Sequence, residues 1–305
     1  MPVRAPDKHT LTDLVGNTPL LQLRLFADSR PRVEVYAKAE WFNPGGSVKD
    51  RAALAMLEAG ERSGALTREK IIIDSTSGNT GIAYALYGAA RGYGVLLVMP
   101  ANVSEERKRL VQAYGAEIVY SDGMEGSDGA IRLCRELIAA QPERYFYPDQ
   151  YNNPANAQAH YQGTAAEILA QTDGRITHFV ATLGTTGTFT GSARRLREHN
   201  PGIVTVAVQP EDAFHGLEGL KHLPSSIVPG IWDPSLADHL WGAPTEPSYA
   251  LAQRLALEEG ILAGHSCGAA LWAVEQLLEE LEDGVVVTVL PDSGDRYLST
   301  GLYRR

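Results

Sequence analysis

The chain has 305 residues, of which 44% are hydrophobic and 21% are charged, and its formal net charge is −10. This composition indicates a globular protein with room for two domains, and it excludes disordered and fibrous classes. The negative charge argues against nucleic acid and anionic membranes as partners, and no apolar run approaches the ~20 residues that a membrane span needs.

Short apolar runs alternate with amphipathic stretches along almost the whole chain. Continuous apolar strands separated by helices are typical of parallel sheets covered on both faces. We therefore predict an α/β protein with two domains, each an open, mostly parallel sheet covered by helices. The Pro/Asn-rich passage 148–156 is the best candidate for a crossing between them. The predicted strands include 33–37, 71–73, 95–98, 117–120, 178–181, 204–208 and 285–290, and the predicted helices include 127–140 and 250–259.

Residues 43–51 read NPGGSVKDR and place a lysine at the start of a predicted helix. Ser47 is a candidate N-cap for this helix. The amine of Lys49 can form a Schiff base only when it is partly deprotonated. Burial and the positive end of the helix both favour this, because they lower the pKa of a lysine. The alternative is an exposed lysine paired with Asp50 or a nearby glutamate, the commoner situation for a lysine considered alone.

Residues 75–81 read STSGNTG and follow the predicted strand 71–73. The hydroxyls of Thr76, Ser77 and Thr80, together with backbone N–H groups, can surround a carboxylate without needing a cation. The alternative is a cluster of serine and threonine caps that satisfies its own helix. The two interpretations are compatible, because the same groups can cap an empty site and bind a substrate.

Residues 184–188 read GTTGT and lie between the predicted strand 178–181 and a predicted helix around 191–198. Glycines let successive N–H groups converge, and the helix start adds its dipole, so this turn suits a phosphate group. The sequence is not a Walker A loop, because no Gly-Lys-Ser/Thr follows, and it lacks the G-x-G-x-x-G spacing of dinucleotide sites. The alternative is an ordinary tight connection.

Residues 264–270 read GHSCGAA and begin a predicted helix through 271–281. Ser266 considered alone would be an N-cap. A reactive amine, a carboxylate-binding loop and a phosphate-binding loop are together what an enzyme needs to hold pyridoxal 5′-phosphate and an amino acid.

These segments resemble the cysteine synthase (O-acetylserine sulfhydrylase) family, of the fold type II pyridoxal-phosphate enzymes. The likeness extends from LVGNTPL at 14–20 to RYLSTG at 296–301. The segment 294–301, GDRYLSTG, looks most like the B-type isoform. The resemblance implies a smaller mobile domain, residues 45–155, inserted into a larger cofactor-binding domain formed by 1–44 and 156–305.

The resemblance also implies roles for individual residues. Lys49 corresponds to the lysine that forms the Schiff base with pyridoxal phosphate, Asn79 to the residue at its 3′-oxygen, and Ser266 to the residue at its pyridine nitrogen. A neutral hydroxyl there leaves the nitrogen largely unprotonated, which suits loss of a β-substituent more than transamination. The residues beside Ser266 are usually small or aliphatic, so His265 and Cys267 depart from the pattern. The cofactor phosphate is assigned to Gly184, Thr185, Thr186, Gly187 and Thr188, and the substrate carboxylate to Thr76, Ser77, Gly78, Thr80 and Gln150.

The implied reaction is a β-replacement that converts an activated L-serine and a sulfur nucleophile to L-cysteine or S-sulfocysteine through an α-aminoacrylate. O-Acetylserine or O-phosphoserine as donor, and sulfide or thiosulfate as sulfur source, remain open. Cystathionine β-synthase or serine/threonine dehydratase activity on the same fold is the alternative. An inactive relative that only binds partners is disfavoured, because the lysine and the phosphate loop are both present.

Lys221 lies in the segment 219–224, where B-type relatives commonly carry an arginine. A lysine there can bind a dianionic phosphate or thiosulfate as a point charge. The alternative is a solvated surface lysine, because lysines are seldom buried.

The remaining features concern partners and location. The histidines show no H-x-x-x-H or cysteine-paired spacing, so we predict no metal site. The first residues lack the apolar core of a signal peptide, and Cys134 and Cys267 lie far apart. We therefore expect a cytoplasmic protein with free thiols. The resemblance implies a homodimer.

Overall fold

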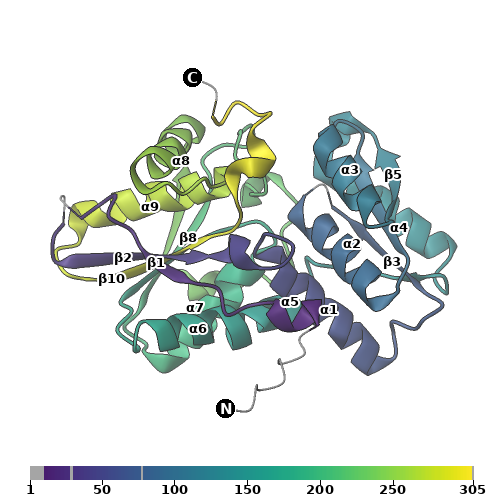
Figure 1. Cartoon of the computed structure of the whole chain (residues 1–305), viewed down its shortest axis with the longest axis horizontal. Helices are drawn as coiled ribbons and strands as arrows, with labels where there is room; N and C mark the ends of the chain where they lie inside the picture. The colour runs from purple at the N-terminus through teal and green to yellow at the C-terminus, as the bar shows by residue number, and fades with distance from the viewer. Residues whose placement is uncertain (1–9, 28–29, 77, 304–305) are drawn as a thin grey trace, which may run out of the picture.

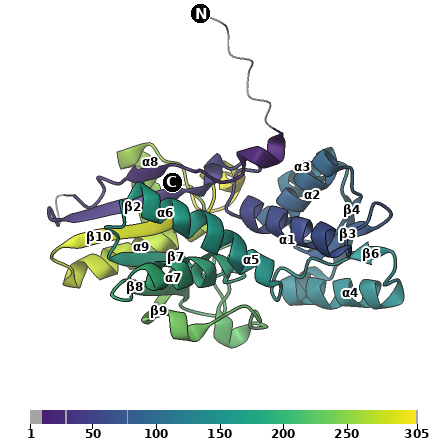
Figure 2. The same ribbon diagram turned by 90° about the horizontal axis from the view of Figure 1, so that it is seen from below.

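The computed structural model describes residues 10–27, 30–76 and 78–303. Strands in this part of the chain form two sheets, a larger sheet of six strands and a smaller sheet of four. Figures 1 and 2 show the two sheets side by side, with the smaller sheet and its helices at the right. No helix within the described ranges is both long and apolar enough to span a membrane.

The larger sheet has the strand order β1-β2-β10-β7-β8-β9. Its neighbours are parallel except for β1 and β2, which are antiparallel. The strands are β1 (Leu20–Gln22), β2 (Val33–Ala39), β7 (His178–Thr182), β8 (Val204–Pro210), β9 (His239–Ala243) and β10 (Gly284–Leu290).

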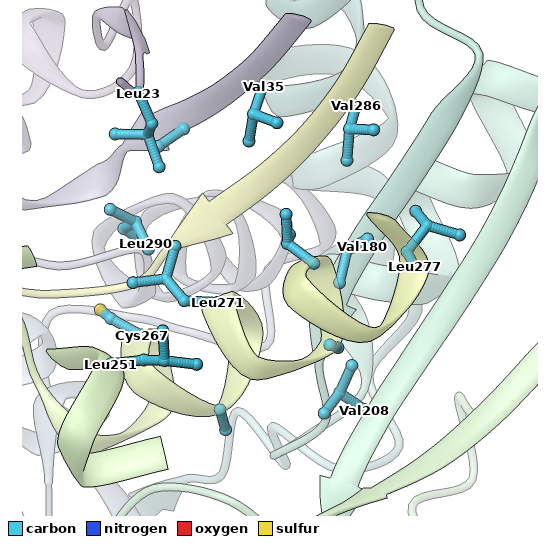
Figure 3. Close-up of a cluster of buried hydrophobic side chains, with 14 of the residues drawn as sticks. Leu23, Val35, Val180, Val208, Leu251, Cys267, Leu271, Leu277, Val286 and Leu290 are labelled. Carbon is cyan, nitrogen blue, oxygen red and sulfur yellow. The ribbon is translucent and has the colours of Figure 1, made fainter. Parts of the chain in front are cut away.

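Alternation along the inner strands of the larger sheet, β2, β7, β8 and β10, sends apolar side chains to two separate cores. On β10, Val286 and Leu290 face one cluster, and Val287 and Val289 face the other, as the two-residue period of a strand requires. Figure 3 shows the first cluster, where side chains of the sheet meet those of α9, including Leu271. Helices α8 (Thr245–Glu259) and α9 (His265–Glu280) cover this face, and α6 (Ala165–Gln171) and α7 (Gly187–His199) cover the other.

The smaller sheet has the order β5-β4-β3-β6, and all its neighbours are parallel. Its strands are β3 (Ile71–Ser75), β4 (Val95–Pro100), β5 (Glu117–Ser121) and β6 (Tyr145–Phe146). Helices α1 (Lys49–Ser63), α2 (Asn79–Arg91) and α3 (Glu105–Ala113) pack on one face, and α4 (Gly126–Ala140) packs on the other. The sheet is therefore covered on both sides, which explains why β4 is buried along its whole length.

Short helical segments connect these elements. Helix α5 (Pro154–Ala159) and the π-helix η4 (His160–Thr164) lead from the smaller sheet back into α6. The other short segments are η1 (Leu11–Leu14), η2 (Glu40–Phe42), η3 (Gly123–Glu125), η5 (Leu223–Ser225), η6 (Pro234–Leu236) and η7 (Gly294–Tyr297).

The seven predicted strands are present, as are the helices predicted at 127–140 and 250–259, and the α/β fold class is confirmed. Helix α8 begins at Thr245, five residues before the predicted start at Ala250. The predictions omitted β1, β6 and β9. We propose that the two sheets belong to two domains, with residues 45–155 inserted into the larger one, because each sheet has its own apolar clusters.

A buried group of charges ties the start of α1 to the larger sheet. The guanidinium of Arg51 contacts Glu40 and Glu167, each at 2.7 Å. Lys38, which is fully buried on β2, contacts Glu167 at 2.7 Å. Burial raises the pKa of Glu167, but Arg51 and Lys38 outweigh it and lower this pKa to about 2. These four charges therefore compensate one another, and they hold α1 beside β2 and α6.

Candidate active site

A cavity of about 270 Å³ lies where the carboxyl ends of strands from both sheets meet. Ligands of open parallel sheets usually bind at such ends. The loops after β3, β7, β8 and β10 each contribute residues to its wall. Most predicted site residues line this cavity, namely Lys49, Thr76, Gly78, Asn79, Thr80, Gln150, Gly184, Thr185, Thr188, Lys221 and Ser266.

Lys49 is the first residue of α1, and its side chain lines the cavity. Burial lowers the pKa of Lys49, while the charge of Asp292 opposes this shift. The backbone N–H of Val48 donates to Pro291 O at 2.8 Å, which fixes the start of α1 to the end of β10. Lys49 is thus an enclosed amine and not an exposed helical lysine.

The N-cap of α1 differs from the prediction. Val48 occupies the N-cap position, and Ser47 lies one residue earlier. The Ser47 Oγ nevertheless accepts a hydrogen bond from Lys49 N at 3.3 Å. The carboxylate of Asp50 folds back and accepts from the N–H groups of Gly45 and Ser47, at 3.1 and 3.2 Å. The Asp50 carboxylate thus holds the residues that precede the helix, and the cap is not the simple serine cap that the sequence indicates.

The loop at 184–188 joins β7 to α7, which begins at Gly187. The first N–H groups of a helix have no partner within it and are available to an anion. An added Cβ at Gly184 would lie 2.6 Å from Gly219 O, and one at Gly187 would lie 2.0 Å from Asn156 Oδ1. Only glycine therefore fits these two positions. Thr186 holds a positive φ of 69°, which turns the chain sharply before the helix.

Two side chains behind this loop hold its threonines. Asn156 Nδ2 donates to Thr185 Oγ1 at 3.0 Å. The buried His160 contacts Thr188 Oγ1 through Nε2 at 3.3 Å and Thr164 Oγ1 through Nδ1 at 2.9 Å. Burial lowers the pKa of His160 well below its ordinary value, so the ring is neutral at neutral pH. The sequence analysis found no role for either residue.

The loop at 75–81 joins β3 to α2 and also lines the cavity. Thr76 Oγ1 accepts from Gly81 N at 3.1 Å, so it satisfies part of its own helix, as the capping interpretation predicted. Thr80 Oγ1 donates to Gln150 Oε1 at 3.0 Å, and Gln150 Nε2 donates to Ser75 O at 3.1 Å. Gln150 is thereby fixed beside the loop. Ser77 lies outside the described residues.

Asn79 is the centre of a polar network that the sequence analysis did not predict. Its Nδ2 donates to Asp292 Oδ2 at 2.5 Å, and its Oδ1 accepts from Arg296. Tyr297 OH also donates to Asp292 Oδ2, at 2.5 Å. Burial raises the pKa of Asp292, whereas Tyr297 and Asn79 act in the opposite direction. Asp292 comes two residues after β10, so its place at a strand's carboxyl end was a signal available in the sequence.

Ser266 lies in the first turn of α9 and lines the cavity, while Gly264 is the N-cap. Cys267 points away into the apolar core between α9 and the larger sheet, as Figure 3 shows. His265 packs edge-on against Tyr297 at a centroid distance of 4.6 Å and is buried. Burial lowers the pKa of His265 to about 4. Both neighbours of Ser266 are therefore packing residues that do not line the cavity.

Lys221 lines the cavity and is only 8% exposed. Its ammonium lies 3.5 Å from Asp128 Oδ1 and 5.1 Å from the centre of the Tyr151 ring. The interpretation of Lys221 as a solvated surface lysine is therefore wrong.

The residues around the cavity fit pyridoxal phosphate. An amine, a loop rich in N–H groups and hydroxyls, and a serine at a helix start converge on one space. Two buried oxygens nearby, Thr186 Oγ1 and Asp292 Oδ1, have no hydrogen-bond partner among the described residues. Buried polar atoms are generally paired, so these two atoms mark places for polar groups from outside the chain. The described ranges contain no cluster of three potential metal ligands.

Comparison with known proteins agrees with this geometry. The family model "Pyridoxal-phosphate dependent enzyme" matches residues 11–292. The chain is 53% identical to a cysteine synthase of Aquifex aeolicus over 97% of this chain and 92% of that protein. It is 41% identical to Cysteine synthase B of Escherichia coli over 96% of both.

A crystal structure of O-acetyl serine sulfhydrylase isoform 3 from Entamoeba histolytica superposes with a TM-score of 0.92 at 35% identity. The match covers 100% of this chain and 95% of that one. The resemblance in the sequence and the fold type are thus confirmed. The chain belongs to the pyridoxal-phosphate dependent enzymes and, among them, to the cysteine synthase family.

Proposed function

We propose that this protein is a pyridoxal-phosphate dependent transferase that makes L-cysteine from an activated L-serine and a sulfur nucleophile. The observation that carries the proposal is the position of Lys49. This enclosed amine faces a cavity whose walls are the loop at 184–188, the loop at 75–81 and Ser266. The identity to cysteine synthases over nearly the whole chain supports the same reaction.

We assign the cofactor to three groups of residues. Lys49 would bond to its aldehyde carbon, and the loop at 184–188 would bind its phosphate with the N–H groups and hydroxyls at the start of α7. Ser266 would meet the pyridine nitrogen, and Asn79 would meet the 3′-oxygen. The bound cofactor supplies an electron sink that makes the α-proton of an attached amino acid acidic.

The protein's own groups then have distinct tasks. Lys49 takes the α-proton as general base, and burial favours this role because it lowers the pKa of the amine. Asp292 and Arg296 hold the Asn79 amide from two sides, which fixes its orientation. The loop at 75–81, including Thr76, Ser77, Gly78 and Thr80, binds the substrate carboxylate together with Gln150. Closure of the domain at 45–155, which carries this loop, onto the larger domain would exclude water.

Product analysis tests the proposal directly. The purified holoenzyme is incubated with O-acetylserine or O-phosphoserine, each with sulfide or thiosulfate, and the products are identified by mass spectrometry. We expect cysteine from sulfide and S-sulfocysteine if thiosulfate is accepted. Formation of only a keto acid, or of cystathionine when homocysteine is offered, would assign the chain to the alternative activities.

We also propose that the protein is a cytoplasmic homodimer, which rests on its similarity to the cysteine synthases. Analytical ultracentrifugation of the holoenzyme tests the oligomeric state.

Replacement of Ser266 by aspartate is expected to change the preferred reaction. A carboxylate at this position would hold the pyridine nitrogen protonated and strengthen the electron sink. Loss of the β-substituent should slow, and transamination should rise. The visible absorption spectrum and the rate of acetate release measure the change. An unaltered spectrum together with an unaltered rate would mean that Ser266 does not meet the nitrogen.

Replacement of Lys221 by alanine should weaken use of O-phosphoserine or thiosulfate by about tenfold, while use of O-acetylserine with sulfide changes far less. The reason is loss of a buried point charge that suits a dianion. Values of kcat/KM for each pair of substrates provide the measurement. Equal loss on all pairs, or no loss on any, would rule out a role for Lys221 in binding anions.

A further inference from the structure

Two ion pairs at the wall of the cavity join the segment after β8 of the larger sheet to helices α3 and α4 of the smaller sheet. Lys221 follows β8 of the larger sheet and pairs with Asp128 of α4 at 3.5 Å. Glu218 lies three residues earlier in the same segment and pairs with Arg107 of α3 at 2.5 Å. The segment that contains Glu218 and Lys221 therefore contacts both α3 and α4, through one carboxylate and one ammonium group.

Each pair places a cation on the wall of the cavity. Arg107, Glu218 and Lys221 line it directly, while Asp128 lies beside the lining residues Ser127 and Ala130. Arg107 also lies over the Tyr297 ring, 5.4 Å from its centre. The two cations are well enclosed, with side chains 18% and 9% exposed, while their carboxylate partners are 39% and 32% exposed.

The Lys221 pair is an ion pair without a hydrogen bond. At 3.5 Å from Asp128, the ammonium donates no hydrogen bond to any residue that the structure describes. Its three N–H groups can therefore be used by a ligand oxygen. An anionic group of a substrate would compete with Asp128 for this charge, because the attraction between charges in such a partly enclosed site is stronger than in water.

We propose that Asp128 and Glu218 determine substrate charge selectivity, by neutralising the two cations on the wall of the cavity. With both pairs formed, the four groups carry no net charge. A donor without a charged leaving group meets no electrostatic barrier there. A dianionic donor or thiosulfate can accept hydrogen bonds from Lys221, but it gains the full attraction of Lys221 or Arg107 only when the neighbouring carboxylate is displaced. Selectivity is the difference between the affinities for two substrates. The carboxylates lower the affinity for an anionic substrate because they compete with it for the two cations. The inference rests on the proposed β-replacement and names the substrate class that this site disfavours.

Replacement of Asp128 by asparagine tests the inference, because it removes the charge and retains the shape. We expect the ratio of kcat/KM for O-phosphoserine to that for O-acetylserine, both with sulfide, to rise about three- to tenfold. Glu218→Gln should raise the same ratio by removing the negative charge beside Arg107, and it provides an independent variant if Asp128→Asn does not fold. A second readout is calorimetric titration of thiosulfate onto the resting holoenzyme, where affinity should rise by a similar factor.

Two controls separate local competition from a general change of charge. Glu136→Gln removes a carboxylate from an exposed position on the same helix, and it should leave the ratio unchanged. In the double variant Asp128→Asn/Lys221→Met, the gain should disappear. The inference is overturned if folded Asp128→Asn and Glu218→Gln proteins keep the parental ratio, if Glu136→Gln gives the same gain, or if the gain persists without Lys221.

The experiment also distinguishes failure of this inference from failure of the proposed function. If the parent makes no cysteine or S-sulfocysteine from any donor, the β-replacement assignment is wrong. The thiosulfate titration then decides the inference alone, because it needs no turnover. Tighter binding in Asp128→Asn supports competition by Asp128, and unchanged binding contradicts it.

Discussion

Replacement of Lys49 by alanine is expected to lower the rate of cysteine formation by at least about 10³-fold while the fold stays intact. The lysine is both the group assigned to bond the cofactor and the proposed base, and general base catalysis alone contributes about 10²–10⁴-fold. Within the described part of the chain the Lys49 side chain forms no ion pair, and the hydrogen bond that fixes the chain at this point comes from the Val48 backbone. Steady-state turnover and far-UV circular dichroism provide the measurements.

Lys70→Ala is the matched control, because Lys70 does not line the cavity. This control should retain parental activity. Loss of the yellow colour is not the decisive readout, because the loop at 184–188 can hold the phosphate without a covalent bond. A Lys49→Ala protein that makes cysteine at a rate near that of the parent would refute the assignment.

Replacement of Arg51 by methionine should lower the free energy of unfolding by about 3–5 kcal/mol. Arg51 contacts Glu40, which is fully buried, and Glu167, which also contacts Lys38. Without the guanidinium, two carboxylates would face a single ammonium in a site with little access to water. Urea unfolding followed by tryptophan fluorescence measures the loss. Activity should also fall, because Arg51 lies two residues after Lys49 on α1.

Two further variants identify the cause of that loss. Arg62→Met changes an arginine at the other end of α1, whose side chain is 70% exposed, and should alter stability by less than about 0.5 kcal/mol. The double variant Arg51→Met/Glu40→Gln removes one uncompensated charge and should be more stable than Arg51→Met. If Arg51→Met unfolds like Arg62→Met, the charge cluster does not support the fold.

Most strands could be predicted because buried parallel strands consist of continuous apolar residues. The strands that were missed, β1, β6 and β9, all lie at sheet edges. β6 has only two residues, and β9 (His239–Ala243) begins with two exposed ones. Such short edge strands form because the adjacent strand of the sheet offers hydrogen bonds. This is a tertiary effect, so the local sequence gives little indication of them.

The binding loops could be predicted because each occupies a recognisable place between a strand and a helix. The charged residues of the two ion pairs beside the cavity could not be predicted. Arg107 resembles any arginine on a polar helix, and Glu218 and Asp128 lie in segments without a motif. Their importance arises only when α3, α4 and the segment after β8 come together. The role of His160 could not be predicted either, because its contact with Thr188 depends on packing between η4 and α7.

The pairing of β2 with β10 also bears on how the chain reaches its native state. Val33 pairs with Gly284, so the larger sheet cannot be completed until about 250 further residues have left the ribosome. The strands of the smaller sheet all lie between Ile71 and Phe146, and their contacts close over much shorter loops. Pairing between segments far apart in the sequence is slow and leaves strand edges exposed. During synthesis, the edge of β2 that later binds β10 therefore stays unpaired. An unpaired strand edge can pair with another chain, so this edge exposes the nascent chain to aggregation until β10 has been made.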